Sequence, residues 1–132
     1  MSVKQQSMQV MILLACAAVV VALTTIPKSV GIVRLVYGIE LIEGHRSAND
    51  AIGHAVLYGT LTAVTYWTFR RQLGFERAFW IALATGLLLG SLTEFIQQFS
   101  PGRSMTLSDL LANWLGVMSV GLLLSYTHAR GR

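Results

Sequence analysis

Three titratable side chains of complementary chemistry interrupt long apolar stretches of the sequence: the imidazole of His54 and the carboxylates of Glu94 and Asp109. An imidazole beside a carboxylate can orient a bound polar group or exchange protons with it. The Arg103 guanidinium adds a planar donor fork that suits phosphate or carboxylate groups. Two amides complete the candidate ligand-binding set, which is His54, Glu94, Gln97, Arg103, Asp109 and Asn113. The set predicts a site that binds a charged headgroup or performs acid–base chemistry.

The spacing of these side chains predicts that they share faces of helices. Residues about four apart lie one turn apart on the same helical face. Three such stripes occur: Asp50, His54 and Tyr58; Gly86, Gly90 and Glu94, continued by Gln97 or Gln98; and Asp109, Asn113 and Gly116. Asp50, Tyr58 and Gln98 are therefore second-tier candidates. We interpret Gly86 and Gly90 as a small-residue face for close helix approach, and such faces could also join copies in a homo-oligomer.

The composition indicates the kind of element that must position these residues. Of the 132 residues, 54% are hydrophobic and only 12% are charged, against about 25% charged in soluble domains. A soluble globule is excluded on this ground. The net charge of +4 does not indicate nucleic-acid binding, because the basic residues are scattered between apolar stretches. The single cysteine, Cys16, excludes an intramolecular disulfide framework.

Four apolar stretches are long enough to cross a bilayer as helices. They cover about residues 8–26, 51–69, 78–97 and 107–126, close to the roughly 20 residues that a spanning helix needs. We therefore predict an all-α membrane protein, a four-transmembrane-helix bundle that forms a single membrane domain over residues 1–132. For residues 28–49 the spacing of apolar residues favours an extracytoplasmic helix in the membrane interface, with two short strands as the alternative.

Basic residues near the ends of the spans predict the orientation. With both termini in the cytoplasm, the inner side carries Lys4, Arg70, Arg71, Arg77, Arg130 and Arg132, and the outer side carries Lys28, Arg34, Arg46 and Arg103. This modest excess agrees with the positive-inside rule, and the arginine-rich loop over 70–77 is its strongest element. Because the spans alternate in direction, His54, Glu94 and Asp109 fall near the same, extracytoplasmic side. We predict a polar pocket open to that side.

These motifs resemble those of the VanZ-like family, small multi-pass membrane proteins named for a protein associated with teicoplanin resistance. The resemblance covers about residues 50–121. It rests on Asp50-Ala-Ile-Gly-His54-Ala-Val-Leu-Tyr58, Gly90-Ser-Leu-Thr-Glu94-Phe-Ile-Gln97, Pro101-Gly102-Arg103 and Asp109-Leu-Leu-Ala-Asn113-Trp-Leu-Gly116. The family commonly has Lys and Phe where this chain has Ala51 and Ala55. The resemblance implies a bacterial inner-membrane protein linked to envelope-acting antibiotics, and it implies no particular reaction.

Three functions are consistent with this pattern. The first is a pocket that binds the headgroup of an envelope lipid, a cell-wall precursor or a lipophilic glycopeptide antibiotic. The second is an intramembrane enzyme that acts on such a headgroup, with His54 as general acid or base and Glu94 or Asp109 as its partner. The third is a structural assembly subunit in which the polar cluster fixes helix register. We expect no cofactor and no metal, because no residues have the spacing of a known metal motif.

Overall fold

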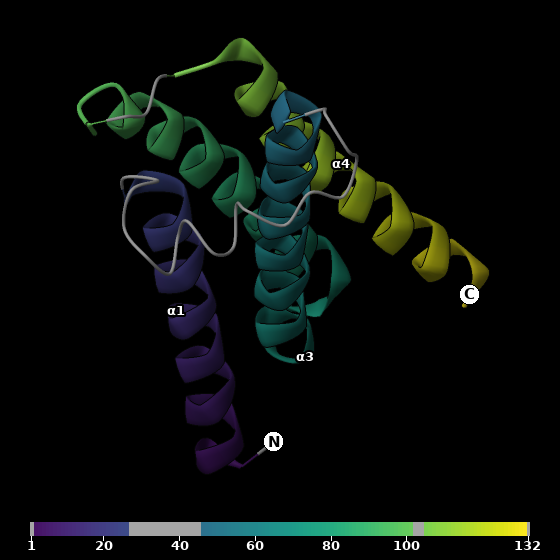
Figure 1. Cartoon of the computed structure of the whole chain (residues 1–132). Helices are drawn as coiled ribbons and strands as arrows, with labels where there is room; N and C mark the ends of the chain where they lie inside the picture. The colour runs from purple at the N-terminus through teal and green to yellow at the C-terminus, as the bar shows by residue number, and fades with distance from the viewer. Residues whose placement is uncertain (1, 27–45, 102–104, 132) are drawn as a thin grey trace.

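The computed structural model describes residues 2–26, 46–101 and 105–131, and in these ranges every regular element is a helix. The helices are α1 (Val3–Thr25), α3 (Arg46–Gln97) and α4 (Leu107–Arg130) (Figure 1). All three are long and apolar enough to cross a membrane. The all-α prediction is therefore confirmed for the described residues. The prediction for residues 28–49 falls mostly outside the described ranges, and its last residues, 46–49, begin α3.

The 52-residue helix α3 folds back on itself at Gly74. Gly74 has φ of 76° and ψ of 179°, a backbone conformation that side chains with a Cβ rarely adopt. On either side of it the chain runs antiparallel, because the hydroxyls of Tyr58 and Thr93 are in contact and Gly86 lies against Thr62. The helix thus consists of a first arm, residues 46–73, and a second arm, residues 75–97. The stretch 70–77, predicted as a loop, is helical apart from this single glycine.

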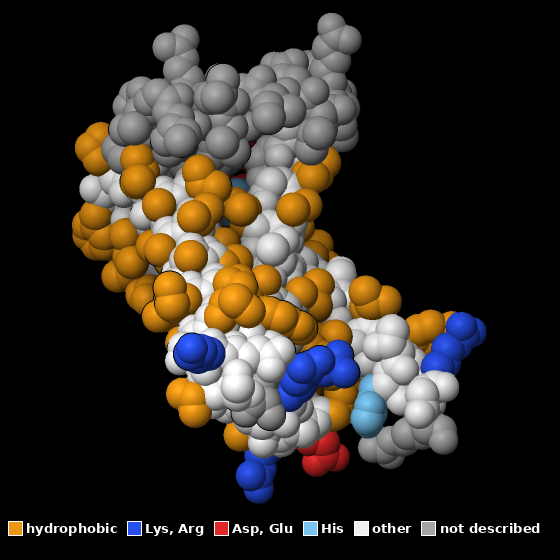
Figure 2. Space-filling model, turned by 90° about the horizontal axis from the view of Figure 1, so that it is seen from below, with side chains coloured by type: hydrophobic (Ala, Val, Ile, Leu, Met, Phe, Trp, Pro, Cys, Tyr) orange, Lys and Arg blue, Asp and Glu red, His pale blue; other side chains and the backbone are white. Residues whose placement is uncertain are grey.

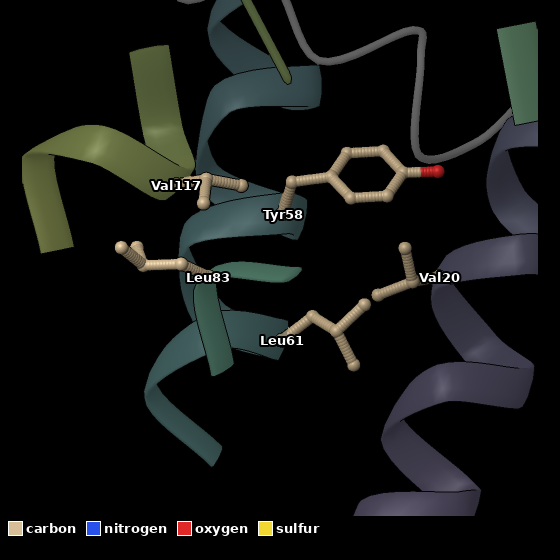
Figure 3. Packing of buried hydrophobic residues seen from close by; sticks show 5 residues of the cluster. All are labelled: Val20, Tyr58, Leu61, Leu83 and Val117. Atoms are coloured by element: carbon tan, nitrogen blue, oxygen red, sulfur yellow. The ribbon is translucent and has the colours of Figure 1, made fainter. Parts of the chain in front are cut away.

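The apolar core draws one side chain or more from α1, from both arms of α3 and from α4. It consists of Val20, Tyr58, Leu61, Leu83 and Val117, which Figure 3 shows pointing toward one another. Many other large apolar side chains face outward: Leu88 and Leu122 are each 70% exposed. An apolar exterior around a small core is what hydrocarbon surroundings permit and water does not.

Glycines bring α4 against both arms of α3. A Cβ added at Gly116 would lie 2.0 Å from the carbonyl oxygen of Ala55, so the backbones of α4 and the first arm touch there. A Cβ at Gly86 would lie 2.5 Å from Thr62 Oγ1 and 2.7 Å from Val117. The interpretation of Gly86 as a residue for close helix approach is confirmed. Side chains on these three helical segments are therefore held at short range.

Candidate functional site

His54, Glu94 and Asn113 meet in one buried cluster between the two arms of α3 and α4. Nδ1 of His54 lies 2.9 Å from Oδ1 of Asn113 and 3.4 Å from Oε1 of Glu94. Nδ2 of Asn113 donates to the same Glu94 oxygen over 3.3 Å. None of the three residues is more than 1% exposed. Three side chains that are far apart in the sequence thus form a closed triangle of polar contacts, which we call the outer cluster.

The hydrogen-bond directions in the outer cluster follow from one backbone carbonyl. Gly90 O can only accept, and it receives a hydrogen bond of 3.0 Å from Nδ2 of Asn113. The other end of that amide is therefore its oxygen, which must accept from His54. Nδ1 of His54 consequently carries a hydrogen, and the neutral ring would accept a proton or a hydrogen bond at Nε2.

Glu94 is the centre of the outer cluster. Its Oε1 also accepts a hydrogen bond of 3.2 Å from Nε2 of Gln97, one turn further along the second arm. Gln97 is 2% exposed, so this contact is buried as well. The N–H groups of two amides are thus directed at one carboxylate oxygen, and the imidazole N–H lies slightly farther away. Such donors suit a carboxylate that bears negative charge, because charge-assisted hydrogen bonds are the stronger ones.

Tyr58 and Thr93 extend the polar contacts below His54, toward the apolar core. Their hydroxyls are in contact, and Thr93 also donates to the carbonyl of Leu89 at 2.9 Å. Tyr58 is fully buried and belongs to the apolar core as well. The second-tier candidate Tyr58 therefore takes part both in a polar contact with Thr93 and in the apolar core that Figure 3 shows.

The other predicted residues lie in different surroundings or outside the described ranges. Asp109 is partly exposed, and its backbone N–H donates a hydrogen bond of 3.1 Å to Oγ1 of Thr106, the N-cap residue of α4. Gln98 is exposed and its amide lies 3.1 Å from Sδ of Met105. Asp50 is partly exposed, one turn before His54. Arg103 lies outside the described residues.

The outer cluster lies near one common end of the helices. Figure 1 shows the end of α1, the start of α3, the end of its second arm and the start of α4 together at the top. His54 follows the start of α3 by about two turns, and Glu94 precedes its end by about one. The prediction that these residues share a depth agrees with this arrangement.

Two contributors were missed by reasoning from the sequence. Thr93 was passed over although it directly precedes Glu94, because a threonine in an apolar helix usually bonds to its own backbone. Gly90 was interpreted only as a small packing residue, yet its carbonyl fixes the orientation of Asn113. No sequence signal marks such a carbonyl, since every helical residue has one.

The chemistry available at the site is proton exchange and hydrogen bonding. Among the described residues, no group of three or more His, Cys, Asp or Glu side chains could hold a metal ion. The imidazole is oriented by an amide and a carboxylate, in the way that a general base or a ligand-binding histidine is oriented in other proteins.

Comparisons with known proteins agree with the membrane architecture. An uncharacterized protein of the fission yeast Schizosaccharomyces pombe is 36% identical over 85 residues, which cover 64% of this chain and 51% of the yeast protein. The chain thus spans about half the length of this curated relative. No solved structure matches. The family model described as VanZ/LLP1 matches residues 8–127, nearly the whole chain. The protein belongs to the VanZ/LLP1 family.

Proposed function

We propose that this membrane protein binds the polar headgroup of an amphiphilic envelope molecule at the outer cluster. The ligand would be a lipid, a cell-wall precursor or a lipophilic glycopeptide antibiotic. The observation that carries the proposal is the buried triangle of His54, Glu94 and Asn113. Membership of the VanZ/LLP1 family supports an envelope role related to antibiotic resistance.

The cost of burying these groups argues against a purely structural role. Interhelical hydrogen bonds in membranes contribute only about 0.6 kcal/mol on average. A carboxylate within a spanning helix costs about 2.5–3.5 kcal/mol on insertion scales. Close packing at Gly86 and Gly116 already holds α4 against both arms of α3. The polar groups therefore add little that helix packing does not supply, and a ligand is the better reason for them.

Each residue of the predicted site has a role in this proposal. His54 would contact the headgroup through Nε2, and Glu94, Gln97 and Asn113 would hold the ring in place. Arg103, which precedes α4 in the sequence, would make a fork-like contact to a phosphate or carboxylate of the ligand. Asp109 and Asp50, both partly exposed near the same end, would line the entrance.

The proposal includes a topology. Each arm of α3 would cross the membrane separately, which gives four crossings together with α1 and α4. The outer cluster would face the extracytoplasmic side of a bacterial inner membrane, and both termini would lie in the cytoplasm. The polar end of the helices would then be accessible to molecules that are made or delivered outside.

The first test is ligand retention by a histidine variant with a matched control. His54→Gln keeps an amide that can donate to Asn113 but removes the imidazole, whereas His128→Gln changes the histidine that stacks on Phe75 in the turn region. Native mass spectrometry of the solubilised proteins would measure the bound amphiphile. We expect His54→Gln to lose at least about tenfold in occupancy, which corresponds to one charge-assisted hydrogen bond, and His128→Gln to retain it. Equal occupancy with a lowered melting temperature would favour the structural role instead.

The oriented imidazole favours catalysis as the second candidate. A histidine whose Nδ1–H is held by Asn113 and Glu94 has the arrangement of a general base. The same mass spectra distinguish the two functions. A headgroup that is altered after incubation with the wild type, and unaltered with His54→Gln, would show an enzyme. An unaltered ligand in both cases leaves binding as the function.

A further inference from the structure

A second buried polar cluster lies between α1 and the first arm of α3, at the opposite end from the outer cluster. At its exposed edge, Nε2 of Gln6 donates a hydrogen bond of 3.1 Å to Oε1 of Gln72. Beneath this edge Gln9 is 2% exposed, Thr65 is 1% exposed and Thr68 is fully buried. We call Gln9, Thr65 and Thr68 the inner cluster. None of them belongs to the predicted site.

Two contacts between α1 and the first arm, one on each side of Gln9, indicate its level relative to the two threonines. Gln6 and Gln72 are bonded at one end of the interface, and Val20 and Leu61 lie side by side in the core at the other (Figure 3). Residues 61, 65, 68 and 72 lie on one face of the first arm, and residues 6, 9, 13 and 20 lie on one face of α1. Because the two helices are antiparallel, three residues beyond Gln6 lie level with about residue 69. This spacing places Gln9 at about the level of Thr68, with Thr65 one turn deeper.

Three oxygens at this level can accept a further hydrogen bond. The Thr65 hydroxyl donates to the carbonyl of Leu61 and the Thr68 hydroxyl to that of Val64, each over 2.8 Å. Both oxygens can therefore only accept from a further partner. Oε1 of Gln9 is also an acceptor, is completely buried, and has no hydrogen-bond partner among the described residues. With the amide in the orientation that buries Oε1, a guest that supplies hydrogens would satisfy this oxygen.

We infer that the inner cluster binds a water molecule, which donates one hydrogen to Oε1 of Gln9 and the other to a threonine hydroxyl. Water is the smallest neutral molecule with two donors, and buried waters typically bridge polar groups that the protein leaves unsatisfied. The exposed amides of Gln6 and Gln72 lie directly above and give water a route from the aqueous phase. The water would join α1 to the first arm, in addition to the apolar contacts.

This inference is independent of the proposed ligand site. The apolar side chains of Val20 and Leu61 lie between the inner and outer clusters. A failure to find a headgroup ligand would therefore leave the inner cluster untouched, and a dry inner cluster would leave the ligand proposal untouched.

A double-mutant cycle tests the bridge by the sign of its effects. If Gln9 simply lacked a donor, Gln9→Leu would remove a buried unsatisfied group and stabilise the protein. A bridging water predicts the opposite, a fall in the folded-to-unfolded ratio of about fivefold or more in Gln9→Leu. Thr68→Val and Thr65→Val should also destabilise. One of the two threonines accepts the second hydrogen of the water. When its valine variant is combined with Gln9→Leu, the fall in the folded-to-unfolded ratio should be at least about threefold smaller than the product of the two single falls.

The control for this cycle is Gln5→Leu, because Gln5 is exposed on α1 and its side chain should tolerate the change. Reversible unfolding in detergent would measure all the variants. A stabilised Gln9→Leu variant, or losses that simply multiply for both threonines, would overturn the inference.

A measurement on the wild type covers the case in which a variant does not fold. In water-edited solid-state NMR of the protein in lipid, polarisation from water should reach the Gln9 side-chain carbonyl about as fast as that of exposed Gln72. Leu13, one turn deeper on the same face of α1, should receive it slowly. A Gln9 signal that builds up as slowly as that of Leu13 would show that the inner cluster is dry. A build-up that requires added sodium or potassium would show a cation site instead, and would equally overturn the inference.

Discussion

At the scale of single residues, Asn113 joins the three helical segments of the outer cluster. Its amide nitrogen donates to the Gly90 carbonyl and to Glu94, and its oxygen accepts from His54. All of these groups are buried, and Asn113 contacts all of them, although Glu94 also accepts from Gln97 and the Gly90 carbonyl from Thr93. An amide carries two donor hydrogens on its nitrogen and an acceptor on a separate oxygen, so it can donate to two groups while it accepts from a third. The residue is therefore chemically specified, and not merely small and polar.

We predict that Asn113→Leu destabilises the protein by at least about 2 kcal/mol. Leucine has nearly the same size but removes the hydrogen bonds of Asn113 to Gly90, Glu94 and His54, and such bonds contribute about 0.5–1.5 kcal/mol each. Unfolding in mild detergent, followed by circular dichroism, would measure the loss.

The control for this prediction is the neighbouring residue. Trp114→Phe removes a hydrogen bond of 3.2 Å from the indole N–H to Ser91, but this contact is exposed. The change should therefore cost less than about 1 kcal/mol. If Asn113→Leu cost no more than Trp114→Phe, the outer cluster would contribute nothing to the stability of the fold.

Part of the outer cluster was predictable from the sequence because polar residues are rare in these spans. His54, Glu94, Gln97 and Asn113 were all predicted, and the structure brings them together. Gln97 and Gln98 could not be separated by spacing alone, although one step along a helix rotates the side chain by about 100°. Gln9 was overlooked, since a single neutral amide does not interrupt an apolar span as a charge does.

At the scale of elements, the crossing of α4 and the first arm of α3 is the tightest contact. The added Cβ at Gly116 would lie within 3 Å of three backbone atoms of Ala55, and a backbone cannot move aside as a flexible side chain can. At this crossing Ala55 directly follows His54, and Gly116 lies about one turn after Asn113. The distance between the side chains of His54 and Asn113 therefore depends on it.

We expect Gly116→Ala to destabilise the protein by at least about 3 kcal/mol, at the upper end of the usual cost of overpacking. Gly53→Ala is the matched control, because nothing lies within 4 Å of its added Cβ. Alanine is also the better helix former there, so stability should stay equal or rise by up to about 1 kcal/mol. Thermal unfolding of both variants would measure the difference. Equal melting temperatures would contradict the backbone contact.

Hydropathy predicted the elements better than their ends. The first span was predicted from residue 8, but α1 begins at Val3, and the second from residue 51, but α3 begins at Arg46. Helical hydrogen bonds do not require apolar side chains, so helices continue past the hydrocarbon into polar sequence. The reversal at residue 74 was expected to need a loop of eight residues. A single glycine with positive φ reverses the chain, and composition does not reveal that so short a turn is sufficient.

At the scale of the whole molecule, basic side chains gather at the end opposite the outer cluster. The Lys and Arg side chains that the structure describes all lie at this end, on α1, around Gly74 and at the end of α4; they are Lys4, Arg70, Arg71, Arg77 and Arg130. Figure 2 shows them in blue across the face seen from below. The Arg130 guanidinium lies 4.5 Å from the Tyr126 ring centre. Over the whole sequence the excess is the modest one of six basic residues against four, and the proposed topology places this end in the cytoplasm. That residues 1–132 form a single domain stays a prediction.

Labelling of single cysteines would test this orientation. In a Cys16→Ser background, Phe99→Cys places a thiol at the exposed end near the outer cluster, and Glu76→Cys places one beside the Gly74 turn. We predict that a membrane-impermeant maleimide labels the residue 99 thiol in intact bacterial cells. The residue 76 thiol should react only after the cells are permeabilised. The reverse pattern would place the outer cluster on the cytoplasmic side.

The fold of α3 has a consequence for how the protein enters a membrane. The imidazole of His54 and the carboxylate of Glu94 belong to one continuous hairpin that closes at Gly74. Chains are synthesised from the N-terminus, so both arms leave the ribosome before α4 does. The two groups can therefore pass from the translocation channel into lipid already facing each other. The nascent chain then does not expose an isolated charge to the hydrocarbon core. Asn113 is synthesised last, and it adds the third side chain to the pair formed by His54 and Glu94.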